Sequence, residues 1–157
     1  MGEDLPVVTP LPKDLTEMKR HLEAAYPDEG CGLILRGPGP DELRVRPMRN
    51  VYDRYHAQDP ERFPRTSRTA YLFDPREWMQ VTEEAEVAGA QVACIFHSHG
   101  DVGAYFSDED KAMAAPDGEP LFPEVSYLVV AVDAGKVTGA KLFAWNGRCF
   151  EEHPATV

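Results

Sequence analysis

Two histidines one residue apart, His97 and His99, follow an apolar run from Val92 to Phe96. Side chains alternate along a β-strand, so we expect both imidazoles on one side, where they can bind a single metal ion. Asp110 follows a glycine-containing loop, from which it can swing back as a third ligand. Two imidazoles and a carboxylate leave a tetrahedral zinc ion one ligand short, which is typical of catalytic sites. Water in the open position would have its pKa lowered toward roughly 7.

Amide hydrolysis at such a site requires a general base and a hydrogen-bond donor for the oxyanion. Glu29, which precedes the Gly30-Cys31-Gly32 start of an apolar strand, is the candidate base. Ser107 is the candidate donor, but a serine three residues before an acidic residue also matches a helix N-cap. Both roles of Ser107 stay open. Glu29 as a solvated acid, and the two histidines as a surface pair at a strand end, are the simpler alternatives.

The spacing of His97-x-His99, seven residues and Ser107-x-x-Asp110 resembles the signature of the JAMM (MPN+) metalloproteases. The segment Glu29-x-Cys31-Gly32 is similar to the upstream glutamate segment of that family, and the resemblance extends from the first expected helix to about residue 150. By position, the resemblance implies that zinc is bound by His97, His99 and Asp110. It also implies that Glu29 is the general acid/base and that Ser107 is the oxyanion donor.

The same resemblance implies an MPN/JAMM-like (cytidine deaminase-like) fold, a mixed and partly antiparallel curved sheet flanked by helices. It implies cleavage of a peptide or isopeptide bond after the C-terminal tail of a ubiquitin-like protein. The chain lacks the long insertions of eukaryotic deubiquitinating members, so it is more similar to small bacterial members. Some of those act on adducts of β-grasp sulfur-carrier proteins. Gly100 and Phe106 stand where many members have proline, which affects loop stiffness and not the ligands.

The elements that must position these residues follow from periodicity and from turn signals. Apolar spacing predicts a helix within Lys13–Tyr26, and Asp74-Pro75 predicts the start of another that ends before Gly89. Ser107 begins a third, short helix. Asn50 to Ala70 has neither period and is expected to be a functional or mobile loop. Strands are expected at residues 31–35, 43–45, 71–73, 91–96, 125–132, 140–145 and 148–151, and around Val7-Val8. This order predicts an α/β or α+β fold in one domain, residues 1–157.

Charge and composition limit the partners. The 157 residues hold 16 Lys and Arg against 27 Asp and Glu, a net charge of −11, which argues against nucleic acid or an anionic membrane surface. The three cysteines are far apart, so a disulfide framework is not expected and a cytoplasmic location fits. We expect no signal peptide and no membrane span. The oligomeric state stays open.

Three functional hypotheses remain at this point. The leading one is a zinc (iso)peptidase that holds an extended tail by strand addition, with the segment 50–70 and the edge strands as candidates. Arginines in that segment are available to meet an acidic carrier; they are Arg54, Arg62, Arg65 and Arg68. The alternatives are a non-catalytic scaffold of the same fold and a zinc hydrolase of small amides.

Overall fold

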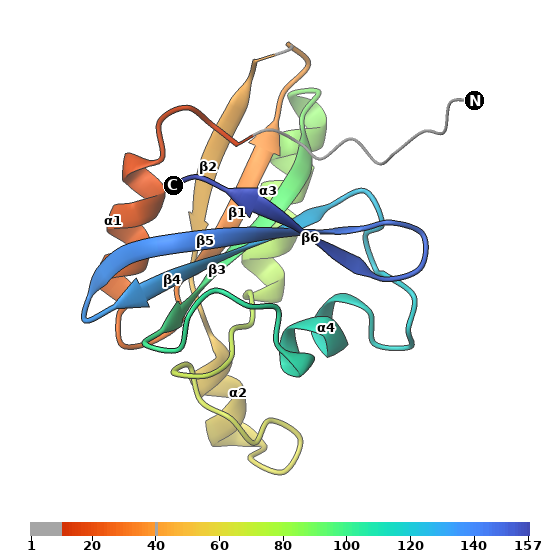
Figure 1. Ribbon diagram of the computed structural model, residues 1–157. Coiled ribbons are helices and arrows are strands. Elements are labelled where there is room, and N and C mark those ends of the chain that lie inside the picture. Colours follow the sequence, from red (N-terminus) through yellow and green to blue (C-terminus); the bar gives the residue numbers. More distant parts are fainter. Residues whose placement is uncertain (1–10, 40) are drawn as a thin grey trace.

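The computed structural model describes residues 11–39 and 41–157 (Figure 1). The strand expected around Val7-Val8 and Pro40 of the expected turn lie outside these residues. In chain order the elements are α1 (Thr16–Ala25), β1 (Cys31–Arg36), β2 (Leu43–Met48), α2 (Tyr52–Gln58), α3 (Pro75–Val87), β3 (Gln91–Gly100), α4 (Asp108–Ala114), β4 (Ser126–Asp133), β5 (Lys136–Trp145) and β6 (Phe150–Ala155).

The strands form one six-stranded sheet in the order β2-β1-β3-β4-β5-β6. Among the strands of the described residues, only β3 and β4 run parallel; the other neighbouring pairs are antiparallel. A parallel pair cannot be closed by a tight turn, and here the crossover from β3 to β4 contains α4. The predicted mixed, partly antiparallel sheet flanked by helices is therefore confirmed, and the segment with Ser107 and Asp110 lies in its one crossover.

Alternation along β3 divides its side chains between two cores. Cys94 and Phe96 pack with α1, which contributes Met18 and Leu22, on one face of the sheet. Ile95 packs with residues of α3 and α4 on the other face. Since side chains two residues apart share a face, the histidines that follow Ile95 at intervals of two lie on the α3 and α4 side.

Gly32 allows β1 and β3 to pack closely. A Cβ atom at position 32 would overlap the aromatic ring of Phe96, which is completely buried. The two residues are opposite each other in the antiparallel pairing of β1 with β3. A side chain at position 32 would therefore displace the ring that directly precedes His97.

The prediction of an unpatterned loop over Asn50–Ala70 was wrong in part, because α2 lies within it. The side chain of Asn50 accepts a hydrogen bond from Tyr52 N at 3.0 Å, which fixes the start of the helix. Within α2 only Tyr52 is buried, where it packs edge-on against Phe63. One buried residue produces no helical period, so the pattern could not indicate this helix.

The strand expected at Tyr71–Phe73 was also wrong; that segment is neither strand nor helix. Its backbone hydrogen bonds go to the segment before α2 and not to the sheet. Val51 N donates to Leu72 O at 2.9 Å, and Leu72 N donates to the Asn50 side chain at 3.2 Å. Burial of Tyr71 therefore arises from packing over the sheet, which an apolar run alone does not distinguish from a strand.

None of the helices in the described ranges has the length and apolarity that a membrane span requires. The three cysteines are free thiols. Cys31 and Cys94 are buried, and Cys149 is exposed.

Candidate metal centre and active site

The end of β3 brings two buried imidazoles together. His97 is completely buried and His99 is 3% exposed, because β3 lies between β1 and β4 in the middle of the sheet. Their Nε2 atoms are 3.2 Å apart. Both rings thus lie on one side of the strand, at the separation that two ligands of one ion require.

Asp110 reaches both histidines from the first turn of α4. Its Oδ1 lies 3.1 Å from His97 Nε2, and its Oδ2 lies 3.2 Å from His99 Nε2. The N-cap of the helix holds this carboxylate in place. Asp110 N donates to Ser107 Oγ and Ser107 N donates to Asp110 Oδ2, each at 3.0 Å. The capping box therefore orients a side chain of the cluster, which links the two alternative roles of Ser107.

Glu29 enters the same cluster from the segment before β1. One carboxylate oxygen of Glu29 and one ring nitrogen each of His97 and His99 lie within 4.8 Å of one another. The Glu29 side chain is buried, and its Oε1 has no hydrogen-bond partner among the described residues. The structure thus brings all four predicted chelating or proton-transferring side chains together, with Ser107 held against Asp110.

Three hydrogen bonds fix the backbone around Glu29. Glu29 N donates to Ser67 O at 2.7 Å, and the Asn50 amide donates to Glu29 O at 2.8 Å. Gly30 N donates to Ser98 Oγ at 2.8 Å, which ties this segment to the residue between the two histidines. The segment from Asn50 to Ser67 therefore holds the general-base candidate in position.

The proton on His99 indicates what the cluster can hold. Its Nδ1 lies 3.1 Å from the carbonyl oxygen of Gly103, which can only accept, so Nδ1 carries the proton. The Nε2 lone pair of a neutral His99 then faces Asp110 Oδ2 and His97 Nε2, both 3.2 Å away. This arrangement of lone pairs suits a cation, or a proton on His97 Nε2, between the three side chains.

The distances among these ligand atoms fit a tetrahedral metal ion. Zinc binds imidazole nitrogen and carboxylate oxygen at about 2.0–2.1 Å, so two ligand atoms of a tetrahedron are about 3.3 Å apart. The two Nε2 atoms are 3.2 Å apart, and each lies 3.1 or 3.2 Å from its nearer oxygen of Asp110, so each pair of side chains is close to this separation. Two nitrogens and a carboxylate are also a donor set that zinc prefers.

Burial and mutual charge set the protonation of the cluster. Burial lowers the pKa of His97 despite the opposing charge of Asp110, which favours the neutral imidazole that binds metals. Burial alone would raise the pKa of Asp110, but hydrogen bonds with both histidines outweigh it and hold this pKa well below its usual range. Burial and the charge of Asp110 raise the pKa of Glu29 to about 9. A positive charge at the histidines would oppose both effects on Glu29.

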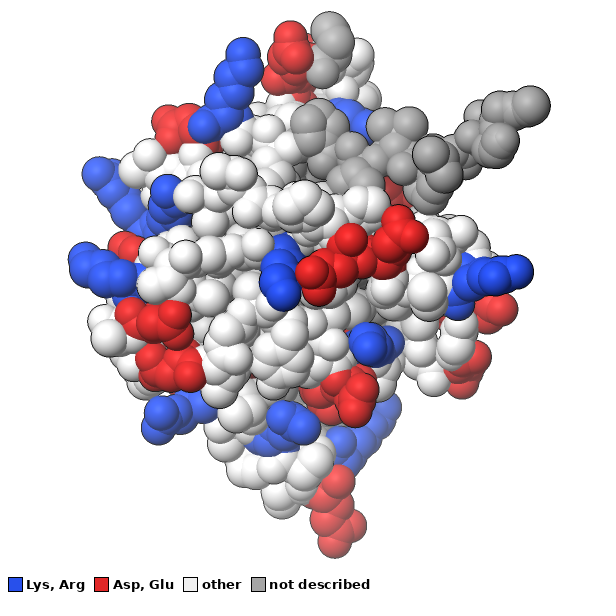
Figure 2. All heavy atoms as spheres, in the orientation of Figure 1, with Lys and Arg blue, Asp and Glu red and all other residues white. Residues whose placement is uncertain are grey.

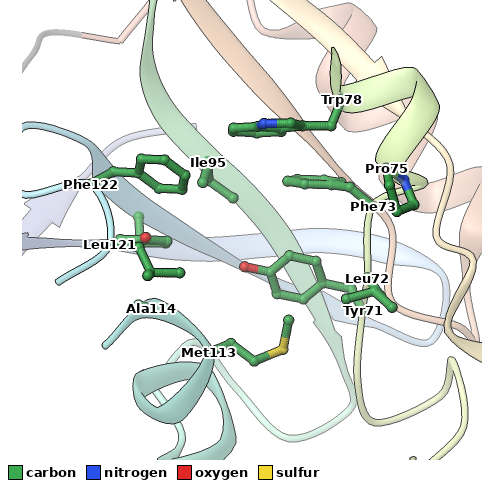
Figure 3. A pocket seen from close by; sticks show the side chains of 11 residues that line it. Tyr71, Leu72, Phe73, Pro75, Trp78, Ile95, Met113, Ala114, Leu121 and Phe122 are labelled. Atoms are coloured by element: carbon green, nitrogen blue, oxygen red, sulfur yellow. The ribbon is translucent and has the colours of Figure 1, made fainter. Parts of the chain in front are cut away.

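An apolar pocket of about 200 Å³ adjoins the cluster (Figure 3). Its wall nearest the cluster is Tyr71, whose ring stacks on His97 with the centroids 4.4 Å apart and the planes inclined by 23°. Figure 3 shows the Tyr71 hydroxyl group pointing into the pocket. Further lining residues come from the segment before α3, from α3, β3 and α4, and from the segment after α4, among them Phe73, Trp78, Ile95, Met113 and Phe122.

Sequence reasoning missed the residues that support the cluster. Asn50 and Ser67 lie in a segment without period, and their contacts with Glu29 become visible only when distant segments meet. Tyr71 was interpreted as part of a strand. Ser98 was interpreted as structural, and its contact with Gly30 N gives that role a partner. Among these, only the place of Ser98 between two candidate ligands provided a signal in the sequence.

Comparisons with known proteins identify relatives of this chain. The curated relatives include proteins named CysO-cysteine peptidase from Mycobacterium bovis and from Mycobacterium tuberculosis, each 30% identical over 114 residues. The match covers 73% of this chain and spans 66% of the length of those relatives.

Solved structures show the same architecture. A solution structure of a protein from Desulfitobacterium hafniense has a TM-score of 0.67 at 26% identity and covers 94% of this chain and 90% of its own. One from Salinibacter ruber has a TM-score of 0.57 at 26% identity and covers 95% of this chain and 90% of its own.

The family of the chain follows from a match over most of its length. Residues 12–146 match the family described as prokaryotic homologs of the JAB domain, and this range includes all the residues of the cluster. The chain therefore belongs to the prokaryotic JAB-domain family.

Proposed function

We propose that this protein is a zinc-dependent peptidase or isopeptidase that cleaves the bond after the C-terminal tail of a ubiquitin-like sulfur-carrier protein. The observation that carries the proposal is the convergence of His97 Nε2, His99 Nε2 and the Asp110 carboxylate beside Glu29, whose buried Oε1 has no hydrogen-bond partner among the described residues. The name of the mycobacterial relatives supports an adduct of a carrier with cysteine as the substrate class.

The proposed reaction gives separate roles to the metal ligands and to the general base. His97, His99 and Asp110 would hold the zinc ion, which supplies Lewis acidity that makes hydroxide available at neutral pH. Glu29 takes the proton of the attacking water on its carboxylate and passes it to the leaving amine nitrogen. The buried position of the Glu29 carboxyl excludes bulk water from this transfer, and the hydrogen bonds to its backbone keep it in reach.

Ser107 can serve the oxyanion while it caps α4. Its Oγ accepts the hydrogen bond from Asp110 N through a lone pair, which leaves the hydroxyl proton available for donation. A donor at this place stabilises the negative oxygen of the tetrahedral intermediate. The same hydroxyl group can therefore accept the bond of the cap and donate to the oxyanion.

The proposal is tested by metal content and hydrolysis measured on the same preparations. We expect one zinc ion per chain and hydrolysis of a diglycine-ended β-grasp carrier joined to cysteine. Glu29→Gln should retain the zinc and lose hydrolysis by about 10²–10⁴-fold, as loss of a general base predicts. Glu83→Gln, which removes an exposed carboxylate on α3, is the matched control and should behave as the wild type.

Full hydrolysis by zinc-loaded Glu29→Gln protein would contradict the assigned mechanism. A purified protein without stoichiometric zinc would favour a non-catalytic scaffold. Turnover of small amides with no turnover of carrier adducts would instead indicate a small-molecule hydrolase.

A further inference from the structure

Arginines gather near the site in a chain that is acidic as a whole. Figure 2 shows Lys and Arg side chains interspersed with Asp and Glu at the lower end of the molecule, where Figure 1 places α2. Two of the arginines in this region are engaged by neighbours. Arg54 pairs with Asp74 at 3.4 Å, and Arg62 lies over the ring of Phe63 at 5.4 Å. Arg65 differs from both because it contacts Thr69 and Glu109, and Glu109 directly precedes Asp110.

Arg65 lies between the two segments that carry the acidic groups of the site. Two residues after it, Ser67 O accepts the hydrogen bond from Glu29 N at 2.7 Å. On the other side, Arg65 Nε lies 3.6 Å from the carboxylate of Glu109, the neighbour of Asp110 on α4. The Arg65 side chain thus reaches from the segment that contacts Glu29 to the start of α4.

The hydrogen-bonding capacity of Arg65 is mostly unused. Nε has the long contact with Glu109, and Nη1 donates to Thr69 O at 3.4 Å. Within residues 11–39 and 41–157, Nη2 has no ion pair or hydrogen bond. The side chain is 46% exposed, so a ligand can approach it. A guanidinium presents a planar fork of donors that matches a carboxylate with two parallel hydrogen bonds.

The proposed substrate has a carboxylate at the corresponding place. When a single amino acid is joined to the carrier through its α-amino group, its carboxyl carbon is separated from the scissile nitrogen by one Cα atom. Bond lengths of about 1.5 Å keep that carboxylate within a few ångströms of the bond that is cut. A cation that recognises it must therefore lie near the metal ligands, and Arg65 contacts Glu109, the residue that precedes the proposed ligand Asp110.

We propose that Arg65 forms a carboxylate-binding subsite that selects adducts in which the released residue ends in a free α-carboxylate. This inference rests on the proposed function and names the leaving group of that reaction. A lysine isopeptide or a longer peptide lacks the charge at this position and gains nothing from Arg65. Glu109 competes with the substrate carboxylate for the same guanidinium and thereby limits the affinity of the subsite.

The test compares two adducts that differ only in charge. A diglycine-ended β-grasp carrier is joined to cysteine or to cysteinamide, and kcat/KM is measured for each with zinc-loaded protein. We expect the wild type to prefer the free acid by about 10–100-fold, and Arg65→Ala to lose this preference because its kcat/KM falls further for the acid than for the amide. Arg65→Lys keeps the charge without the fork and should retain part of the preference. Arg62→Ala is the matched control and should retain all of it, whereas Glu109→Gln should increase it.

Equal cleavage of acid and amide by the wild type, or an equal loss for both in Arg65→Ala, would overturn the inference and leave the proposed function intact. If neither adduct is cleaved, the proposed function fails, and binding still decides the role of Arg65. In that case the affinities of Glu29→Gln protein for the two adducts are compared by calorimetry, with and without Arg65→Ala. A tighter acid complex that depends on Arg65 supports the subsite, and equal affinities refute it.

Discussion

At the scale of single residues, Glu29 makes the folded protein sensitive to pH. Burial and the charge of Asp110 raise the pKa of its carboxyl to about 9, from 4.5 for the group in water. Between these pH values the folded protein holds a proton on Glu29 that the unfolded chain has lost. The free energy of unfolding must therefore fall as the pH rises through this window.

Glu29→Gln should remove this effect in zinc-free protein, because an amide has no proton to lose in this range. We expect the variant to be more stable than the wild type, with a difference that widens from about pH 5 to about pH 8. Urea unfolding in the presence of a chelator at several pH values measures it, with Glu83→Gln as control. A difference independent of pH would show that the carboxyl titrates normally in the folded state.

At the scale of elements, the start of α4 combines helix capping with the chemistry proposed for the site. Ser107→Ala should cost about 1 kcal/mol of stability through loss of the cap, whereas Ser107→Gly should cost only a few tenths. If the hydroxyl donates to the oxyanion, both variants should lose about 10²–10³-fold in kcat despite their different stabilities. Chemical unfolding and steady-state kinetics separate the two effects. Activity that follows stability would reduce Ser107 to a cap.

The junction between β2 and α2 depends on Asn50. Its side chain donates to Glu29 O and Ala70 O and accepts from Tyr52 N and Leu72 N. Asn50→Asp retains the acceptor but loses both donors, so it should lower the stability by about 2 kcal/mol and lower kcat through displacement of Glu29. Zinc content should stay at the wild-type level, because Asn50 contacts none of the proposed ligands. A loss of zinc together with kcat would indicate a general loss of structure.

These elements also show what the sequence could predict. Both histidines, Asp110 and the N-cap at Ser107 are local features, written within fourteen residues, and the structure brings them together as expected. The mixed sheet follows from apolar runs and turns. Asn50 and α2 were missed because their stability comes from hydrogen bonds and contacts between distant segments, which leave no period in the chain. Arg65 likewise acquires its place only when the segment before α3 packs against Glu29.

At the scale of the whole molecule, the proposed metal ligands join β3 to the crossover that leads to β4. A metal that binds only the folded chain should therefore stabilise the entire sheet. At free zinc about 100-fold above the dissociation constant, we expect about 2.7 kcal/mol of added stability. Calorimetry with zinc and with a chelator measures the change in Tm, and His99→Ala should abolish it. An unchanged Tm in the wild type would contradict a zinc site at this place.

Because Gly32 packs closely against Phe96, the two ends of the Glu29-x-Cys31-Gly32 motif are under different constraints. Under the proposed function, Glu29 is retained for its role in the reaction, and a descendant that no longer hydrolysed its substrate could replace it. Gly32 is required by the space that the ring of Phe96 occupies, and it would be retained for as long as position 96 stays aromatic. In a diverging lineage, loss of the glutamate with retention of the glycine would therefore indicate a protein that retains this fold but has lost the proposed hydrolysis.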